Sequence, residues 1–161
     1  MKKTFFTVLF AALTMGVAAQ TTNAKETKCD TTIINSDNAT LPIYPGGEQE
    51  MMKFLQKNIK YPEVAEKYGV EGRVIMSFIV DKNGKPKDIT AKDCKLERFN
   101  TTKFNQEPAS RQAQLKEQFA LLFAKEGARI ISKMPKWTPG TVDGKPANVS
   151  YSLPIKFSMP K

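Results

Sequence analysis

The chain has 161 residues and a formal net charge of +9, from 25 Lys and Arg against 16 Asp and Glu. It has no histidine and only two cysteines, which excludes Ser-His-Asp and Cys-His catalytic groups, His-ligated metal sites and thiolate-rich zinc sites. Paired carboxylates stand among lysines at helical spacing, as on a solvated surface, so we expect no enzyme, no cofactor and no metal site.

The N-terminus has the pattern of a secretory signal. Lys2 and Lys3 precede an uncharged run, residues 5–19, that is shorter than the roughly 20 residues a helix needs to cross a bilayer. The small residues Val17 and Ala19 fit a cleavage site after position 19. We therefore predict that residues 1–19 are a signal peptide and that the remainder is exported. An uncleaved membrane anchor is the alternative.

Export changes how the charge and the two cysteines are interpreted. For an exported basic chain, nucleic acid is an improbable partner, and an anionic membrane or wall polymer accounts better for the positive charge. In an oxidising compartment two cysteines usually pair, so we expect a disulfide between Cys29 and Cys94, with two unpaired thiols as the alternative. Residues 20–40 are polar and rich in Thr and Asn, which predicts a flexible tail or linker.

The first periodic segment begins after Gly46 and Gly47. Over residues 48–60, apolar residues recur at helical spacing with acids at the start and lysines at the end, which predicts an amphipathic helix. Its apolar stripe, which we expect in the core, comprises Met51, Met52, Phe54, Leu55 and Ile59. Pro62 then starts a short second helix that Gly69 caps.

Two strands joined by a tight turn follow. Residues 70–80 alternate with a period of two, which predicts a strand. The sequence Asp81-Lys82-Asn83-Gly84 predicts a hairpin turn into a weaker, more polar strand over residues 86–94. Residues 95–110 show no clear period, and we expect an irregular excursion there.

A long helix and a last strand complete the pattern. Residues 111–134 carry a stripe of large apolar residues with small ones beside it, which predicts a helix lying close on a sheet. Residues 147–157 alternate again, and Pro154 on the polar phase places this strand at an edge. Because the helix carries the chain back, the last strand pairs with the first. We predict an α+β fold: a three-stranded antiparallel sheet of order 2-1-3 with helices on one face.

Several short motifs stand in a characteristic order along most of the chain. They are Tyr44-Pro45-Gly46-Gly47, Tyr61-Pro62, Gly69-Val70-Glu71-Gly72-Arg73-Val74, Val80-Asp81-Lys82-Asn83-Gly84, Lys133-Met134-Pro135-Lys136-Trp137-Thr138-Pro139-Gly140, and Gly144-Lys145-Pro146 before Leu153-Pro154-Ile155-Lys156-Phe157. In order and spacing they resemble the TonB C-terminal domain family, most closely its stand-alone periplasmic versions from Bacteroides-like bacteria. The fold of that family agrees with the one predicted above.

The resemblance implies a non-catalytic periplasmic domain. Such a domain captures an extended segment of an outer-membrane transporter, the TonB box, or of another envelope protein. Capture would be β-augmentation, in which backbone groups of the last strand pair with the segment. Carried onto this sequence, the capturing strand comprises Asn148, Val149, Ser150, Tyr151, Ser152, Leu153 and Ile155, with Trp137 and Tyr61 in support.

The predicted organisation is a signal peptide at 1–19, a linker at 20–40 and a TonB C-terminal-like domain at 41–161 with an insertion at about 95–116. Two other interpretations stay open. An uncleaved N-terminal segment would make the chain a short, membrane-anchored energy transducer, although residues 20–40 contain no proline and so lack the family's usual spacer. Pairing of two copies through the last strand would make it a homodimeric envelope scaffold.

Overall fold

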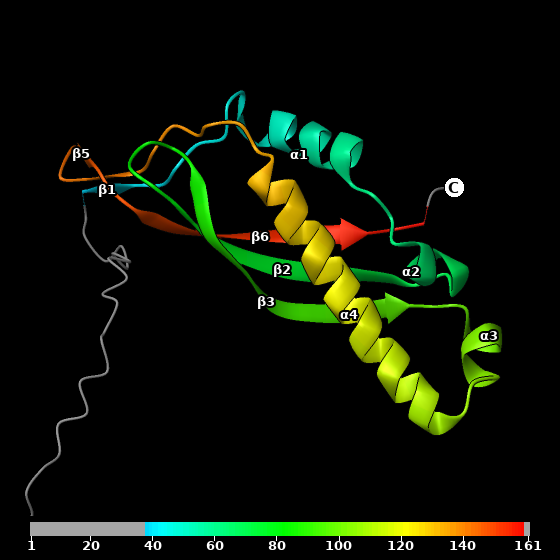
Figure 1. The fold of residues 1–161 in the computed structure, drawn as a ribbon. Coiled ribbons are helices and arrows are strands. Elements are labelled where there is room, and N and C mark those ends of the chain that lie inside the picture. The colour runs from blue at the N-terminus through cyan, green and yellow to red at the C-terminus, as the bar shows by residue number, and fades with distance from the viewer. Residues whose placement is uncertain (1–37, 160–161) are drawn as a thin grey trace, which may run out of the picture.

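The computed structural model describes residues 38–159, which form a three-stranded main sheet, a helical layer and a small second sheet (Figure 1). The predicted signal peptide, most of the predicted linker and Cys29 lie outside the described residues. The predictions made for those segments therefore stay predictions.

The main sheet has the strand order β3-β2-β6, and both outer strands run antiparallel to β2. Its strands are β2 (Glu71–Val80), β3 (Pro86–Arg98) and β6 (Val149–Phe157). The pairing of β6 with β2 has no register shift along the whole of β6. The predicted α+β class and the predicted order 2-1-3 are confirmed.

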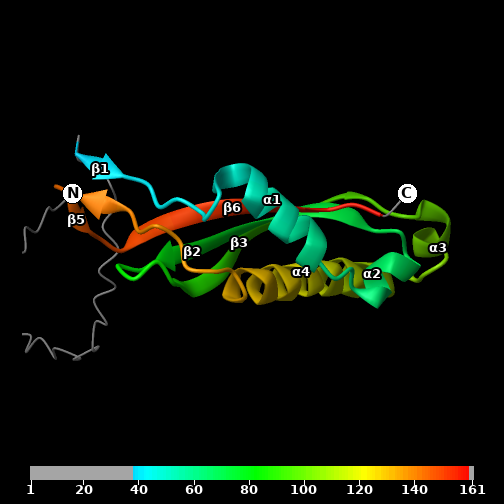
Figure 2. The same ribbon diagram turned by 90° about the horizontal axis from the view of Figure 1, so that it is seen from above.

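The helical layer lies mainly on one face of this sheet (Figure 2), and its first helix lies beside β6 at the edge of the sheet (Figure 1). Its helices are α1 (Gly47–Asn58), α2 (Glu63–Lys67), α3 (Thr101–Asn105) and α4 (Ala109–Ser132). α4 packs on β2 and β3, and a Cβ atom on Gly127 would stand 2.9 Å from Sδ of Met76. The absence of a side chain at position 127 therefore lets α4 lie close on the sheet. The long helix predicted over 111–134 is confirmed, with both ends two residues earlier.

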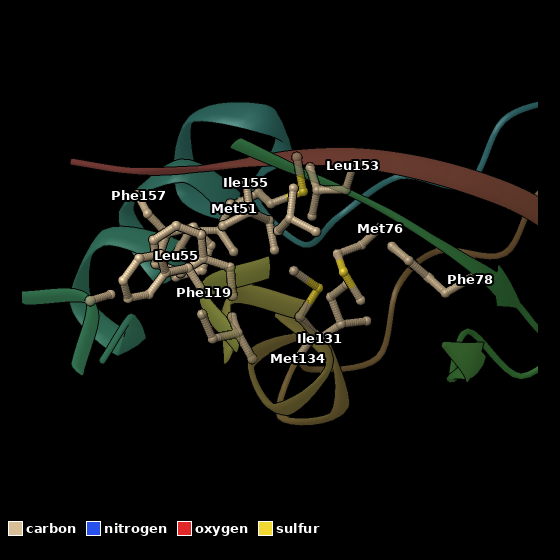
Figure 3. Close-up of a cluster of buried hydrophobic side chains, with 14 of the residues drawn as sticks. Met51, Leu55, Met76, Phe78, Phe119, Ile131, Met134, Leu153, Ile155 and Phe157 are labelled. Atoms are coloured by element: carbon tan, nitrogen blue, oxygen red, sulfur yellow. The ribbon is translucent and has the colours of Figure 1, made fainter. Parts of the chain in front are cut away.

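One face of β2 supplies the centre of the hydrophobic core. Its alternate residues Val74, Met76, Phe78 and Val80 are buried, as the period of two predicts. Figure 3 shows Met76 and Phe78 in one cluster with side chains from α1, α4 and β6. The core thus lies between the sheet and the helical layer.

The residues of the apolar stripe on α1 differ in how deeply they are buried. Met51 and Leu55 are buried, whereas Phe54 and Ile59 are half-buried. The prediction that Met52 lies in the core is wrong, because this side chain is 47% exposed. Successive helical residues are about 100° apart around the axis, so burying Met51 turns Met52 to the side of the helix.

The segment 95–110 forms mostly regular structure where no period is visible in the sequence. β3 continues to Arg98 and does not end at Cys94, and α3 follows it. Asn100 caps α3, since its side-chain oxygen accepts a hydrogen bond of 3.2 Å from the N–H of Lys103. The period of two is obscured because the register of β3 with β2 is irregular at three places.

A small sheet closes one end of the domain. It is formed by β1 (Ala39–Thr40), β4 (Thr141–Val142) and β5 (Lys145–Pro146), with β1 antiparallel to β4. The backbone of Ile43 also exchanges hydrogen bonds of 3.0 and 2.8 Å with Thr138. The start of the described chain is thereby held against the segment that leads into β6.

The predicted hairpin turn between β2 and β3 is confirmed, and it contacts Trp137. The Asp81 carboxylate accepts hydrogen bonds of 2.8 and 2.9 Å from the N–H groups of Asn83 and Lys85. Gly84 has φ +79°, and a Cβ atom there would stand 1.9 Å from the backbone oxygen of Trp137. Position 84 therefore requires glycine both for its backbone conformation and for this close approach.

Gly84→Ala is expected to lower the free energy of unfolding by about 3 to 4 kcal/mol, because it combines a left-handed backbone with a backbone clash. Gly144→Ala is the matched control, since φ is +74° but nothing in the described chain lies within 4 Å of the added Cβ. The control should lose only about 1 kcal/mol. Urea denaturation measures both losses, and equal losses would contradict the role of the Trp137 contact.

Candidate functional site

β6 has one side that no described strand occupies, as the sequence predicts. It pairs with β2 along its length, and Pro154 lies opposite Ile75. A proline has no N–H, so a strand tolerates it where that group would face an open edge. Backbone groups alternate in direction along an antiparallel strand, so Ser150, Ser152 and Lys156 also direct their N–H and C=O groups outward. β6 therefore has a regular edge at which another strand can pair.

The side chains of β6 separate into two faces. Val149, Leu153 and Ile155 are buried, so a ligand at the edge meets mainly their backbone. Ser150 and Ser152 are exposed on the opposite face. Among the predicted site residues of β6, the two serines are exposed and Tyr151 is half-buried.

Asn148, the first residue of the predicted capturing strand, lies immediately before β6. Its side-chain oxygen accepts a hydrogen bond of 3.2 Å from the N–H of Lys82. Asn148 therefore ties the turn between β2 and β3 to the start of β6, and the strand itself begins one residue later.

Trp137 supports the first half of β6. It is 3% exposed, and its ring packs edge-on against Tyr44 and Tyr151, with centroid distances of 5.4 and 5.0 Å. Phe78 of β2 completes this aromatic group at 5.7 Å from Trp137. Tyr151, which is half-buried, thus packs against the rings of Trp137 and of Phe78, the latter at 5.7 Å.

Tyr61 supports the other end of β6. Its ring stands edge-on to Phe123 of α4 at 6.0 Å and to Phe157 at 6.3 Å. Its hydroxyl donates a hydrogen bond to the carbonyl oxygen of Val70. Trp137 and Tyr61 therefore contact β6 at positions 151 and 157, about 20 Å apart along an extended strand, and the fold does not bring them together.

A groove of about 400 Å³ lies beside the edge of β6, between this strand and α1. Its wall includes Met52, Leu55, Ile59, Tyr61, Pro154 and Ile155. Sequence reasoning missed the groove because it forms only when α1 and β6 lie next to each other in space. One residue could have indicated the groove in the sequence. Met52 follows the buried Met51, and in the structure its side chain is exposed and lines the groove.

A buried carboxylate of α4 holds the segment that follows α1. Glu126 is 8% exposed, and its Oε1 accepts a hydrogen bond of 2.6 Å from the N–H of Lys60. Arg129 donates to Glu126 at 2.7 Å and to the carbonyl oxygen of Asn58 at 2.6 Å. The hydrogen bond to Glu126 raises the pKa of Arg129. Because Ile59 lies between Asn58 and Lys60, this contact sets one wall of the groove.

Within residues 38–159, no three His, Cys, Asp or Glu side chains are grouped so that they could hold a metal ion. Cys94 is half-buried against the core, and burial, followed by the nearby Asp93 carboxylate, raises the pKa of its thiol. Its predicted partner, Cys29, lies outside the described residues. No helix in the described part of the chain has both the length and the apolar character needed to cross a membrane.

A comparison with protein families assigns part of this structure. Residues 57–101, which include α2, β2 and β3, match the family model of the Gram-negative bacterial TonB protein C-terminal. Over these residues the chain is similar to that family. The family resemblance drawn from the sequence is thereby confirmed over residues 57–101. β6 and the groove beside it lie largely outside the matched segment.

Two solution structures of the Helicobacter pylori TonB-CTD also match the chain. The longer fragment is 20% identical, with 73% of this chain and 88% of that chain covered and a TM-score of 0.38. The shorter fragment is 20% identical, with 68% of this chain and 90% of that chain covered and a TM-score of 0.36. No curated protein matches the chain.

The free energy of unfolding is expected to fall as pH rises from about 10 to about 12. Burial, followed by the Glu71 and Glu66 carboxylates, raises the pKa of Tyr61 from 10.0 to about 12. In this window the unfolded chain loses the tyrosine proton while the folded chain keeps it, which favours unfolding. Tyr61→Phe removes this contribution, so its stability should fall less with pH. Urea denaturation at about pH 8 and about pH 11 measures the difference, and equal falls in both proteins would contradict the assignment.

Proposed function

We propose that this protein binds extended peptide segments of outer-membrane transporters, or of other envelope proteins, by β-augmentation, and that β6 is the strand to which they add. The observation that carries the proposal is the regular ladder of β6 with β2, whose outer side no described strand occupies. The TonB C-terminal family interacts with outer-membrane transporters, which supports this choice of partner. No catalytic step is part of the proposal.

The two edges of the sheet differ in a way that favours β6. The register of β3 with β2 is irregular at three places, and β3 is rich in exposed charged residues. Bulges and charges are common protections of an edge against added strands. β6 has no register shift, and no charged residue stands between Val149 and Ile155. Pro154 removes one outward donor from β6. From Val149 to Leu153 an incoming strand still meets a regular, uncharged edge, whereas the edge of β3 is irregular and charged.

Backbone pairing and the groove have different roles in this proposal. Each hydrogen bond between the strands contributes about 1 kcal/mol net, whatever the side chains are, so the ladder supplies affinity. Side chains of an added strand alternate between the two faces, and those opposite Ile155 point towards the helical layer. There they reach the groove beside Met52. The groove therefore favours ligand segments with apolar residues at alternate positions.

Ser152→Pro is expected to weaken binding of a synthetic transporter N-terminal peptide about tenfold, because it removes one outward N–H from the edge. Position 152 directs its backbone away from β2, so the ladder with β2 should be kept. Ser152→Ala keeps the N–H and is the matched control, which should bind as the unmodified protein does. Isothermal titration calorimetry measures the affinities, and thermal unfolding shows that both variants fold.

A backbone N-methylated peptide tests the same ladder from the ligand side. It should bind the unmodified protein more weakly than the normal peptide does, because it lacks donors for the edge. Equal binding of the two peptides, or no binding of either, contradicts the proposal. Sedimentation velocity without peptide tests whether two copies of the chain pair through β6 instead. A concentration-dependent dimer that Ser152→Pro abolishes would mean that a second copy occupies this edge.

Met52→Asp is expected to weaken peptide binding about tenfold, because it places a charge where an apolar side chain of the ligand would be buried. Met52 is largely exposed, so the fold should be kept. Leu121→Asp on α4 replaces a side chain that is 55% exposed and does not line the groove, and it is the matched control. Calorimetric titration with an apolar alternating peptide compares the two, and equal losses would remove the groove from the site.

A further inference from the structure

The face of the sheet opposite the helical layer carries a row of three basic residues. Arg73 of β2 lies opposite Lys95 of β3 on one side and opposite Lys156 of β6 on the other. Residues directly opposite each other in an antiparallel sheet share a face, with Cβ atoms about 5 Å apart. All three residues are exposed, and Figure 2 shows α4 on the other side of the strands.

This row is unfavourable for folding. Like charges directly opposite each other destabilise a sheet, and none of the three residues belongs to an ion pair within residues 38–159. Three acids lie near the row. Glu97 is exposed and stands two residues along β3 from Lys95. Asp93 is in the next row, opposite Ile75, and Glu71 is engaged by Arg98 at 3.3 Å and by the N–H of Met159 at 3.1 Å. A folding cost with so little local compensation is typical of a functional surface.

Lys87 extends the positive surface along the sheet. It is exposed and lies opposite Ile79, further along β2 on the same face. Asp93, and Asp88 next to Lys87, are the acidic residues of β3 between Lys95 and Lys87. The large apolar residues that the described structure exposes belong to none of the three strands. The face therefore carries an excess of positive charge and none of the most exposed large apolar side chains, while Ile75 on it is half-buried.

We propose that this basic sheet face, formed by Arg73, Lys87, Lys95 and Lys156, binds the phosphate groups of an anionic lipid bilayer. A bilayer presents many phosphates in one plane and meets all four cations at once. A peptide strand added to β6 lies beside Lys156 alone and leaves the rest of the face uncovered. The contact is electrostatic, it does not depend on peptide capture, and it holds the strands of the sheet parallel to the membrane surface.

Vesicle sedimentation of the full-length protein tests the proposal with two triple variants of equal charge. The row variant is Arg73→Gln/Lys95→Gln/Lys156→Gln. The control variant, which removes three exposed lysines outside the main sheet, is Lys125→Gln/Lys133→Gln/Lys136→Gln. On vesicles of phosphatidylcholine with phosphatidylglycerol, the row variant should bind about a hundredfold more weakly than the unmodified protein, or about fivefold per cation. The control variant should lose much less.

Three further measurements decide the outcome. Vesicles of phosphatidylcholine alone report apolar binding, which is common to the three proteins and is subtracted. Salt raised from about 0.01 M to about 1 M shortens the screening length from about 30 Å to about 3 Å and should release the protein. Equal losses in the two variants, or binding that salt does not weaken, overturn the proposal. Row-dependent binding to soluble polyglutamate without binding to anionic vesicles also overturns it, because the face would then recognise an acidic protein.

Discussion

The close packing of α4 on β2 is the constraint on which the rest of this domain depends. Gly127 leaves room for Met76 of β2, and a Cβ atom there would also stand 3.6 Å from Ile155 of β6. A single helix position therefore touches both the central strand and the edge strand. Because the helices share this face, the opposite face and the outer side of β6 stay outside the core. Both proposed binding surfaces are the parts of the sheet that this packing leaves uncovered.

The parts of the fold that could be predicted from the sequence have local signals. The alternation of β6, the turn at 81–84 and the stripe of α4 each depend on residues a few positions apart. Pro154 located the open edge because a missing N–H is a property of one residue. The strand order then followed from the directions in which short connections carry the chain.

The parts that could not be predicted depend on contacts between distant segments. Met51 and Met52 look alike in sequence, and only the seating of α1 on the sheet separates them. The length of β3 is hidden because irregular pairing breaks the period of two. Glu126 looks like other carboxylates of a helix surface, yet its Oε1 meets the N–H of Lys60, 66 residues earlier. The groove, which needs both α1 and β6, has no pattern of its own in the chain.

The small sheet at the end of the domain also has a mechanical consequence. β1 holds the start of the described chain through two residues paired with β4, and the Ile43–Thr138 backbone contact follows it. Traction applied at Asn38 would load these few hydrogen bonds before it reached the core. These hydrogen bonds can break one after another. The segment from Asn38 to Ile43 would then extend while β2, β3 and β6 stay paired. Under load, this attachment would therefore break before the main sheet, which holds the proposed ligand, comes apart.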